Sequence, residues 1–193
     1  SFSKIISVVL HPLWMPLLVV YLSLNYIPFV KPSIYNNIGA IYLSIFVYSV
    51  FLPLISLFVL IKLKILNSLE IFKLRERPLP LFITFFWVSL GLFSLQNILL
   101  FVPFLNAALL GCVIIIILSS FVSLFWKISL HMLGMGGVLA VLVGASVLYE
   151  TRPVLIIFLI FLSGVLGSAR LYENAHSSTQ IYSGFIVGFL IQL

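Results

Sequence analysis

Residues 79–126 read LPLFITFFWVSLGLFSLQNILLFVPFLNAALLGCVIIIILSSFVSLFW, and this stretch decides the fold. It contains no Asp, Glu, Lys, Arg or His. A helix advances about 1.5 Å per residue, so it needs about 20 apolar residues to cross about 30 Å of hydrocarbon. The stretch is too long for one crossing, and Asn97 and Pro103 interrupt it near the middle. We therefore expect two membrane-spanning helices joined by a tight turn.

The composition extends this interpretation to the whole chain of 193 residues. Hydrophobic residues make up 63% of the sequence and charged residues only 7%, whereas soluble domains carry about 25% charged residues. The mean hydropathy is +1.33. So few charges cannot cover a soluble surface, and lipid must cover most of the outside. The sequence predicts a single integral membrane domain over residues 1–193.

Apolar runs that could cross the bilayer occur along the whole chain. They cover residues 5–26, 38–61, 79–101, 104–125, 132–148, 154–169 and 181–193, of which the last two are short. We expect an all-α polytopic bundle of about six to seven spans, in which residues 1–62 form an N-terminal helix pair. His11, Pro12 and Pro16 predict that the first segment is kinked or interfacial, and His11 is assigned no catalytic role.

The basic residues fall unevenly on the two faces of this bundle. If the spans alternate in direction, the N-terminus and residues 62–78, 127–131 and 170–180 emerge on one face. That face receives most of the basic residues, namely Lys4, Lys62, Lys64, Lys73, Arg75, Arg77, Lys127 and Arg170. The positive-inside rule accounts for such a split, because basic loops stay in the cytoplasm. An anion site at the span ends also accounts for it, and both interpretations stay open.

Two histidines favour the anion site, since His131 and His176 join the basic residues on the same face. An ionisable group at membrane depth is costly, so a converging set indicates a functional site, although one such His alone is more often structural. The sequence has four acidic residues and none is Asp, so the clustered carboxylates of a metal-dependent phosphatase are missing. Histidine beside fixed positive charge suits phosphate chemistry that needs no metal or other cofactor.

Three short stretches carry a resemblance to a known family. Residues 70–78 read EIFKLRERP, residues 128–131 read ISLH, and residues 168–180 read SARLYENAHSSTQ. They resemble, in order, the three motifs of the type 2 phosphatidic acid phosphatases, whose relatives include vanadium-dependent haloperoxidases. Those motifs are Lys, six residues and Arg-Pro; Pro-Ser-Gly-His; and Ser-Arg, five residues, His, three residues and Asp. The resemblance implies a phosphatase-like core over residues 70–190.

The resemblance also implies a role for each matching side chain. His176 would attack phosphorus to form a phosphohistidine, and His131 would protonate the leaving group. Arg77 and Arg170 would bind phosphate oxygens, and Ser129 would be a further phosphate-binding residue. The implied substrate is a lipid phosphate. We expect it to enter sideways from the bilayer, because the predicted site lies at span ends and no soluble domain is expected to collect a water-soluble substrate.

Two departures from the family motifs concern charges at the site. Glu70 stands where the family has Lys, so Lys73 or Lys127 is the candidate replacement, and an unpaired carboxylate there would repel phosphate. Gln180 stands where the family has Asp, four residues after His176 and on the same helix face. Gln offers the imidazole an oxygen but no charge. Loss of an equivalent carboxylate in a serine-protease triad costs about 10⁴-fold in rate.

The sequence thus predicts hydrolysis of a phosphate monoester or diphosphate on a lipid, with weak or no activity if Gln180 disables the nucleophile. Glu173 precedes His176 by three residues and is a second acid to consider, although an acid at an interface is usually only solvated. The alternative function is a non-catalytic relative that binds a lipid phosphate or supports a membrane complex. A small transporter ranks last, because paired broken helices are not evident.

The expected partners are membrane lipids and not nucleic acid, because the basic runs are short and interrupted. A small chain of this kind is typical of a bacterial plasma membrane. The charge split places the site on the cytoplasmic face, whereas the family usually works on the outer face, so the sidedness stays open.

Overall fold

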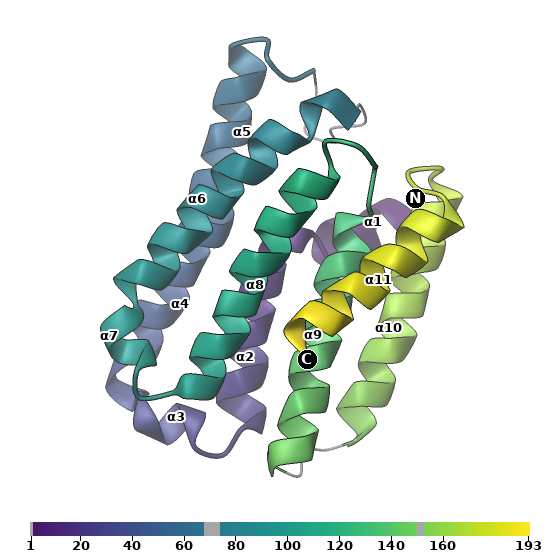
Figure 1. Ribbon diagram of the computed structural model, residues 1–193. Helices are drawn as coiled ribbons and strands as arrows, with labels where there is room; N and C mark the ends of the chain where they lie inside the picture. Colours follow the sequence, from purple (N-terminus) through teal and green to yellow (C-terminus); the bar gives the residue numbers. More distant parts are fainter. Residues whose placement is uncertain (1, 68–73, 150–152) are drawn as a thin grey trace.

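The computed structural model describes residues 2–67, 74–149 and 153–193, and in these residues all regular structure is helical (Figure 1). Six segments are long and apolar enough to cross a membrane: Phe2–Tyr26, Tyr35–Lys62, Leu74–Ser94, Pro103–Val122, Leu130–Tyr149 and Pro153–Tyr172. The prediction of an all-α polytopic bundle is confirmed. The chain is an integral membrane protein.

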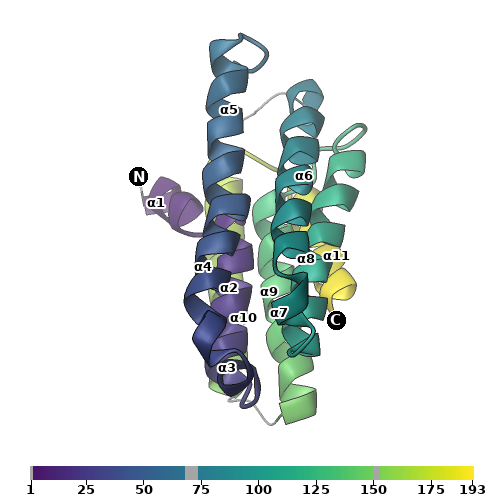
Figure 2. The ribbon, with the colours of Figure 1, turned by 90° about the vertical axis from the view of Figure 1, so that its left-hand side faces the viewer.

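The first of these segments is bent in the middle. α1 (Phe2–Val9) lies across the bundle and α2 (Met15–Tyr26) runs along it, with the short helix η1 (Pro12–Trp14) between them (Figure 2). The break comes at His11, because the proline that follows holds residue 11 in an extended conformation with φ −66° and ψ 140°. The predicted kink at His11 and Pro12 is confirmed.

α1 turns its polar side toward the protein and its apolar side outward. Ser3 and Ser7 are buried, whereas Phe2, Ile5 and Val8 are exposed. An outward apolar face suits a helix in contact with hydrocarbon, where such side chains cost nothing to expose. The buried serines therefore face an interior feature of the bundle.

The middle of the chain builds one wall of the bundle. α3 (Val30–Ser33) and η2 (Tyr35–Asn37) lead into a second crossing made of α4 (Ile38–Phe46), the π-helical turn η3 (Val47–Phe51) and α5 (Leu52–Lys62). After η4 (Leu74–Glu76), the long apolar stretch folds into α6 (Pro78–Ser94), α7 (Gln96–Leu99) and α8 (Pro103–Val122). The predicted hairpin is confirmed, since α6 packs against α8. Both helices begin with proline. Proline has no backbone N–H, but at the first position of a helix this group has no partner within the helix in any residue, so its loss costs nothing.

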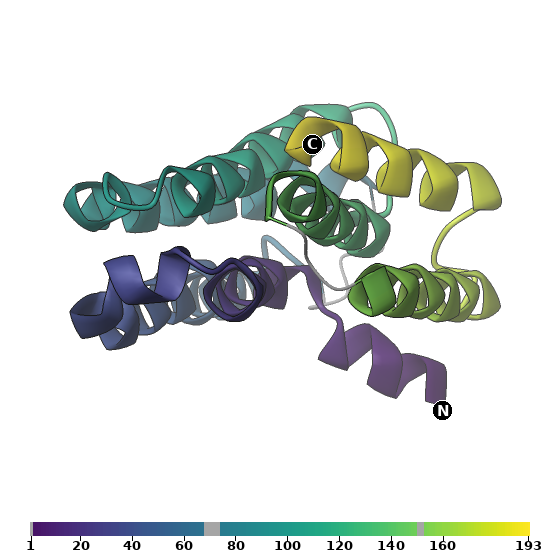
Figure 3. The same cartoon turned by 90° about the horizontal axis from the view of Figure 1, so that it is seen from below.

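α9 (Leu130–Tyr149) forms the centre of the bundle and contacts α2, α8, α10 (Pro153–Tyr172) and α11 (Ser178–Gln192). α11 crosses α9 obliquely and very closely (Figures 1 and 3). Glycine makes this approach possible, because a Cβ at Gly188 would lie 1.9 Å from the Leu133 carbonyl oxygen.

α11 is shorter than the other crossings. Its 15 residues span about 22 Å at 1.5 Å per residue, which is less than the hydrocarbon thickness. Six of the seven predicted spans therefore reach the length of a crossing, and the run at 181–193 does not. A capping box on Ser177 starts this helix at Ser178, close to the cluster of polar residues described next.

Candidate functional site

A cavity of about 920 Å³ lies within the bundle and has a polar part and an apolar part. Helices α5, α8 and α10 end toward the same end of the molecule, as the alternation of spans predicts (Figure 1). The polar part of the cavity is lined by Ser3, Lys4, Ser7, His11, Arg77, Lys127, His131, Arg170, Glu173 and His176. Apolar side chains of several helices line the rest, including Val19, Leu54, Leu81, Val88 and Ile115. A ligand with a charged head and an apolar tail matches this division.

His176 lies in the connection between α10 and α11, and the cap of α11 fixes its orientation. Gln180 Oε1 accepts the Ser177 backbone N–H at 3.2 Å and the Nδ1–H of His176 at 3.1 Å. Because a carboxamide oxygen can only accept, Nδ1 carries the proton and Nε2 keeps its lone pair. The predicted contact between residues 176 and 180 is confirmed, but the predicted shared helix face is wrong, because His176 precedes α11 and the contact is made at its cap. Gln180 orients the imidazole but gives it no negative charge.

Burial and nearby cations keep the His176 imidazole neutral. The pKa of His176 is lowered from 6.5 to about 4, mainly by burial and next by Arg77, with smaller contributions from Arg170 and Lys127. The hydrogen bond to Gln180 raises this pKa but does not offset them. A lowered pKa favours the unprotonated form, so the Nε2 lone pair persists at neutral pH. Burial, then Arg77 and Arg170, also lower the pKa of Lys127. Three cations from distant parts of the chain thus face one imidazole.

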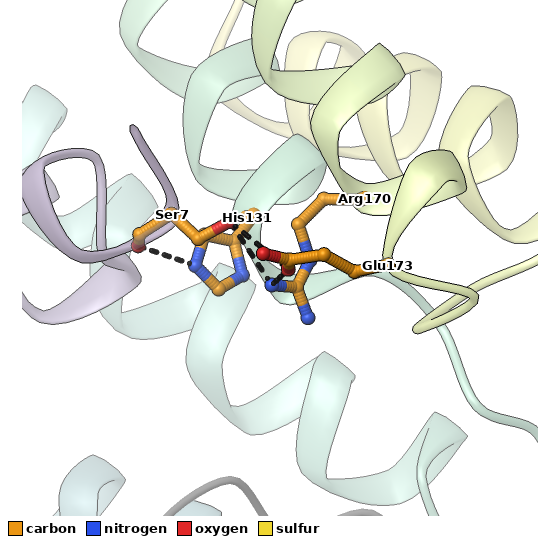
Figure 4. A network of polar contacts seen from close by, with 4 residues as sticks. All are labelled: Ser7, His131, Arg170 and Glu173. Atoms are coloured by element: carbon orange, nitrogen blue, oxygen red, sulfur yellow. Dashed lines mark hydrogen bonds and ion pairs between the residues drawn. The ribbon is translucent and has the colours of Figure 1, made fainter. Parts of the chain in front are cut away.

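His131 lies at the start of α9 and is held by α1. Its Nε2 donates to the Ser7 carbonyl oxygen at 3.0 Å. That carbonyl belongs to the last turn of α1, where helical carbonyls lack a backbone partner. In a continued helix the His11 N–H would bond to the Ser7 carbonyl, but here it bonds to the Val8 carbonyl. Because Nε2 keeps its proton in this bond, Nδ1 is the atom that can gain or lose one. Figure 4 shows the His131 ring between Ser7 and the Arg170 guanidinium.

Arg170 is held by an acid from its own helix end and by α1. Its Nη1 lies 2.8 Å from Glu173 Oε2 and donates to Ser7 Oγ at 3.1 Å (Figure 4). The Ser7 hydroxyl in turn donates to Glu173 Oε2 at 3.4 Å. Glu173 therefore partly neutralises Arg170, and none of these bonds reaches His176. The serine side of α1 completes this network.

Arg77 is the most buried cation of the cavity, with a side chain only 6% exposed. It immediately precedes α6, and its Nη1 donates to the Ile128 carbonyl oxygen at 3.0 Å, which ties α6 to the connection before α9. Arginine stays charged even when buried, so it needs a counter-charge. Within the described part of the chain its hydrogen-bond partner is a neutral carbonyl. The cavity therefore holds a guanidinium that an anionic ligand would stabilise.

The other predicted site residues have different positions. Lys127 lines the cavity. Ser129 is fully buried and lies outside the cavity lining, with its hydroxyl unpaired and its N–H bonded to the Gln180 carbonyl at 3.3 Å. Ser129, the residue before α9, therefore contacts α11 through its backbone, and its predicted role in phosphate binding stays a prediction. Lys73 and Glu70 lie outside the described residues.

Two residues of the cavity were not expected from the sequence. The sequence indicates only a kink at His11 and no catalytic role, yet its ring centroid lies 5.5 Å from that of His131 with an interplanar angle of 83°. Ser7 binds His131 through its carbonyl and Arg170 through its hydroxyl. The sequence signal for His11 is Pro12 beside it, which predicts a kink in the first segment, and Ser7 gives none.

No family model, curated protein or solved structure matches this chain. In residues 2–67, 74–149 and 153–193, no group of three His, Cys, Asp or Glu side chains could hold a metal ion. The functional conclusion therefore rests on the imidazoles and cations of the cavity.

Proposed function

We propose that this protein is a membrane lipid phosphatase, with a core like that of the type 2 phosphatidic acid phosphatases, and that it acts through a phosphohistidine. One observation carries the proposal. The buried Arg77 guanidinium, which hydrogen-bonds a neutral carbonyl, lines the same cavity as His176, whose Nε2 lone pair is free because Nδ1 carries the proton. A phosphate ester supplies both the missing negative charge and an electrophilic phosphorus atom.

The first half of the reaction uses residues from four parts of the chain. Arg77 and Arg170 bind non-bridging phosphate oxygens, and Lys127 adds positive charge. His176 Nε2 attacks phosphorus, so an N–P bond forms as the bond from phosphorus to the leaving oxygen breaks. His131, which is protonated when the anionic phosphate is bound beside it, gives its Nδ1 proton to that oxygen while its Nε2–H stays bonded to the Ser7 carbonyl. The products are the phosphorylated imidazole and either a lipid alcohol or, from a diphosphate, a lipid monophosphate.

The second half returns the site to its starting state. His131, now neutral at Nδ1, takes a proton from water as the water oxygen bonds to phosphorus and the N–P bond breaks. Inorganic phosphate leaves, His176 Nε2 regains its lone pair, and His131 is again protonated. Gln180 holds the Nδ1–H of His176 throughout. Because its amide has no charge, the positive ring of the intermediate is weakly stabilised and turnover is slow.

The apolar part of the cavity favours a lipid as the substrate. Its walls come from α2, α5, α6 and α8, all of which belong to segments long enough to cross the membrane. Each buried CH₂ group of a tail is worth about 0.8 kcal/mol, so a tail in this region binds far better than a water-soluble ester. Entry from the side of the bilayer follows, because the described chain has no soluble domain.

Phosphate release from a panel of lipids tests the proposal. The purified protein in detergent micelles should release inorganic phosphate from at least one of phosphatidic acid, phosphatidylglycerophosphate, lipid A and a polyprenyl diphosphate. Release should continue in the presence of a metal chelator, because imidazole is the nucleophile. Glycerol 3-phosphate, which has no tail, is the matched control and should react more slowly. No release from the whole panel would contradict the proposal.

A non-catalytic binder of lipid phosphates is the second candidate, and two contacts favour it. Glu173 already pairs with Arg170 at 2.8 Å, which reduces the charge available to a transition state. Gln180 contacts His176 without charge. A binder would retain the same lipids in micelles and release no phosphate from them.

A further inference from the structure

We propose that His11 is a third imidazole of the ligand site and donates its Nε2–H to an oxygen of the bound phosphate. This inference rests on the anion site proposed above, but not on its catalysis. It concerns a residue that lies far from the three motifs in sequence and in the first segment of the chain. A neutral donor here adds a hydrogen bond to the phosphate without adding another positive charge.

The tautomer of His11 follows from its local structure. His11 caps η1, and its Nδ1 accepts the Leu13 backbone N–H at 3.3 Å. An acceptor nitrogen in a neutral imidazole carries no proton, so Nε2 is the protonated atom. No described residue accepts that proton in a hydrogen bond, and the side chain lines the cavity. The site therefore presents an unused donor to any ligand it holds.

The position of His11 is fixed from two sides. Pro12 sets the backbone that follows, and Ser49 Oγ donates to the Leu13 carbonyl at 3.4 Å. Ser49 is buried in η3, the π-helical turn that interrupts the second crossing, and such turns often occur at functional sites. The second crossing thus braces the bend that carries His11. A braced donor loses little entropy when it binds a ligand.

The ring contact places His11 on the leaving-group side of the site. Its centroid is 5.5 Å from that of His131, the proposed proton donor, and the rings meet edge to face. When a phosphate is bound between His176 and His131, the oxygens on its leaving-group side therefore lie near the part of the cavity that His11 lines. His11 would bind such an oxygen and would not itself transfer a proton, because its Nδ1 is occupied by Leu13.

A purely structural role as the cap of η1 makes a different prediction, and His11→Asn separates the two. Asn is a favoured capping residue, so it keeps the bond to the Leu13 N–H, but it is too short to place a donor in the cavity. We expect the variant to keep the wild-type Tm in detergent and to bind inorganic phosphate about tenfold more weakly, as the loss of one hydrogen bond to an anion implies. Equal phosphate affinity in the variant and the wild type would overturn the proposal.

A second measurement uses the wild-type protein alone. The chain has three histidines, so ¹⁵N NMR of the imidazoles resolves each one, and the Nε2–H signal of His11 should shift as inorganic phosphate is added. A His11 signal that stays fixed while phosphate binds would overturn the proposal. If phosphate binds and shifts His11 but no lipid is hydrolysed, the catalytic proposal fails and this one stands. If the wild type binds no phosphate, both fail.

Discussion

Replacing His176 with Asn should lower the rate of phosphate release by about 10⁴-fold or more. The Asn side chain keeps an N–H that can bond to Gln180 Oε1 in place of the imidazole Nδ1–H, but it has no second nitrogen. The atom that attacks phosphorus is lost while the cap of α11 is kept. Release of phosphate from the best lipid of the panel, with both proteins in the same micelles, measures the ratio.

Two controls make this result specific to the nucleophile. His176→Asn should keep the wild-type Tm and should still bind inorganic phosphate, because the guanidinium of Arg77 and its bond to Ile128 are unchanged. A variant that unfolds or loses phosphate affinity would show a structural role for His176. A well-folded variant with full activity would rule out the phosphohistidine mechanism.

Replacing Gln180 with Glu should raise the rate about 10- to 1,000-fold, less than the roughly 10⁴-fold that a carboxylate is worth in a serine-protease triad. Glu preserves the capping box, because Glu at this position can still accept the Ser177 backbone N–H. It also places a negative charge on the oxygen that lies 3.1 Å from His176 Nδ1. Aspartate, which the type 2 phosphatidic acid phosphatase motif has at the corresponding position, is one carbon shorter and should give a smaller gain here.

A neighbouring substitution separates this local effect from a general effect of charge. Thr179→Glu adds the same charge to the first turn of α11 but does not contact His176, so its rate should remain near that of the wild type. Gln180→Glu should also raise the pKa of His176 above the wild-type value of about 4, because a carboxylate stabilises the protonated ring. Imidazole ¹⁵N titration measures that change. An unchanged rate and an unchanged pKa would contradict the proposed role of residue 180.

The crossings of this fold were predictable because length and interruption determine them. The stretch 79–126 had to turn near Asn97 and Pro103, and it does so between α6 and α8. The path of α11 was not predictable. The large apolar side chains of that helix are spread over all its sides, so they do not select a neighbour. Gly184 and Gly188, four residues apart, mark a face suited to close packing, but the sequence does not say which helix packs there.

The candidate site was predictable where the alternation of spans decides it, because that alternation brings Arg77, His131 and Arg170 to one cavity. The contact between residues 176 and 180 was expected from helix spacing, but it is made at the cap of α11, which begins at Ser178. Contacts made by backbone groups could not be predicted in this way. The Ser7 carbonyl is available to His131 only because α1 ends at Val9, and His11 joins the site only because the chain bends there.

The most direct test of the whole account is to locate the phosphoryl group during turnover. The protein would be mixed with a ³²P-labelled lipid substrate, quenched in alkali, which preserves phosphohistidine, and mapped by mass spectrometry. A phosphohistidine mechanism predicts one labelled position, His176, and no label in the His176→Asn variant. Label on another residue, or undiminished label in the variant, would contradict the claim that the imidazole of His176 attacks phosphorus in this cavity.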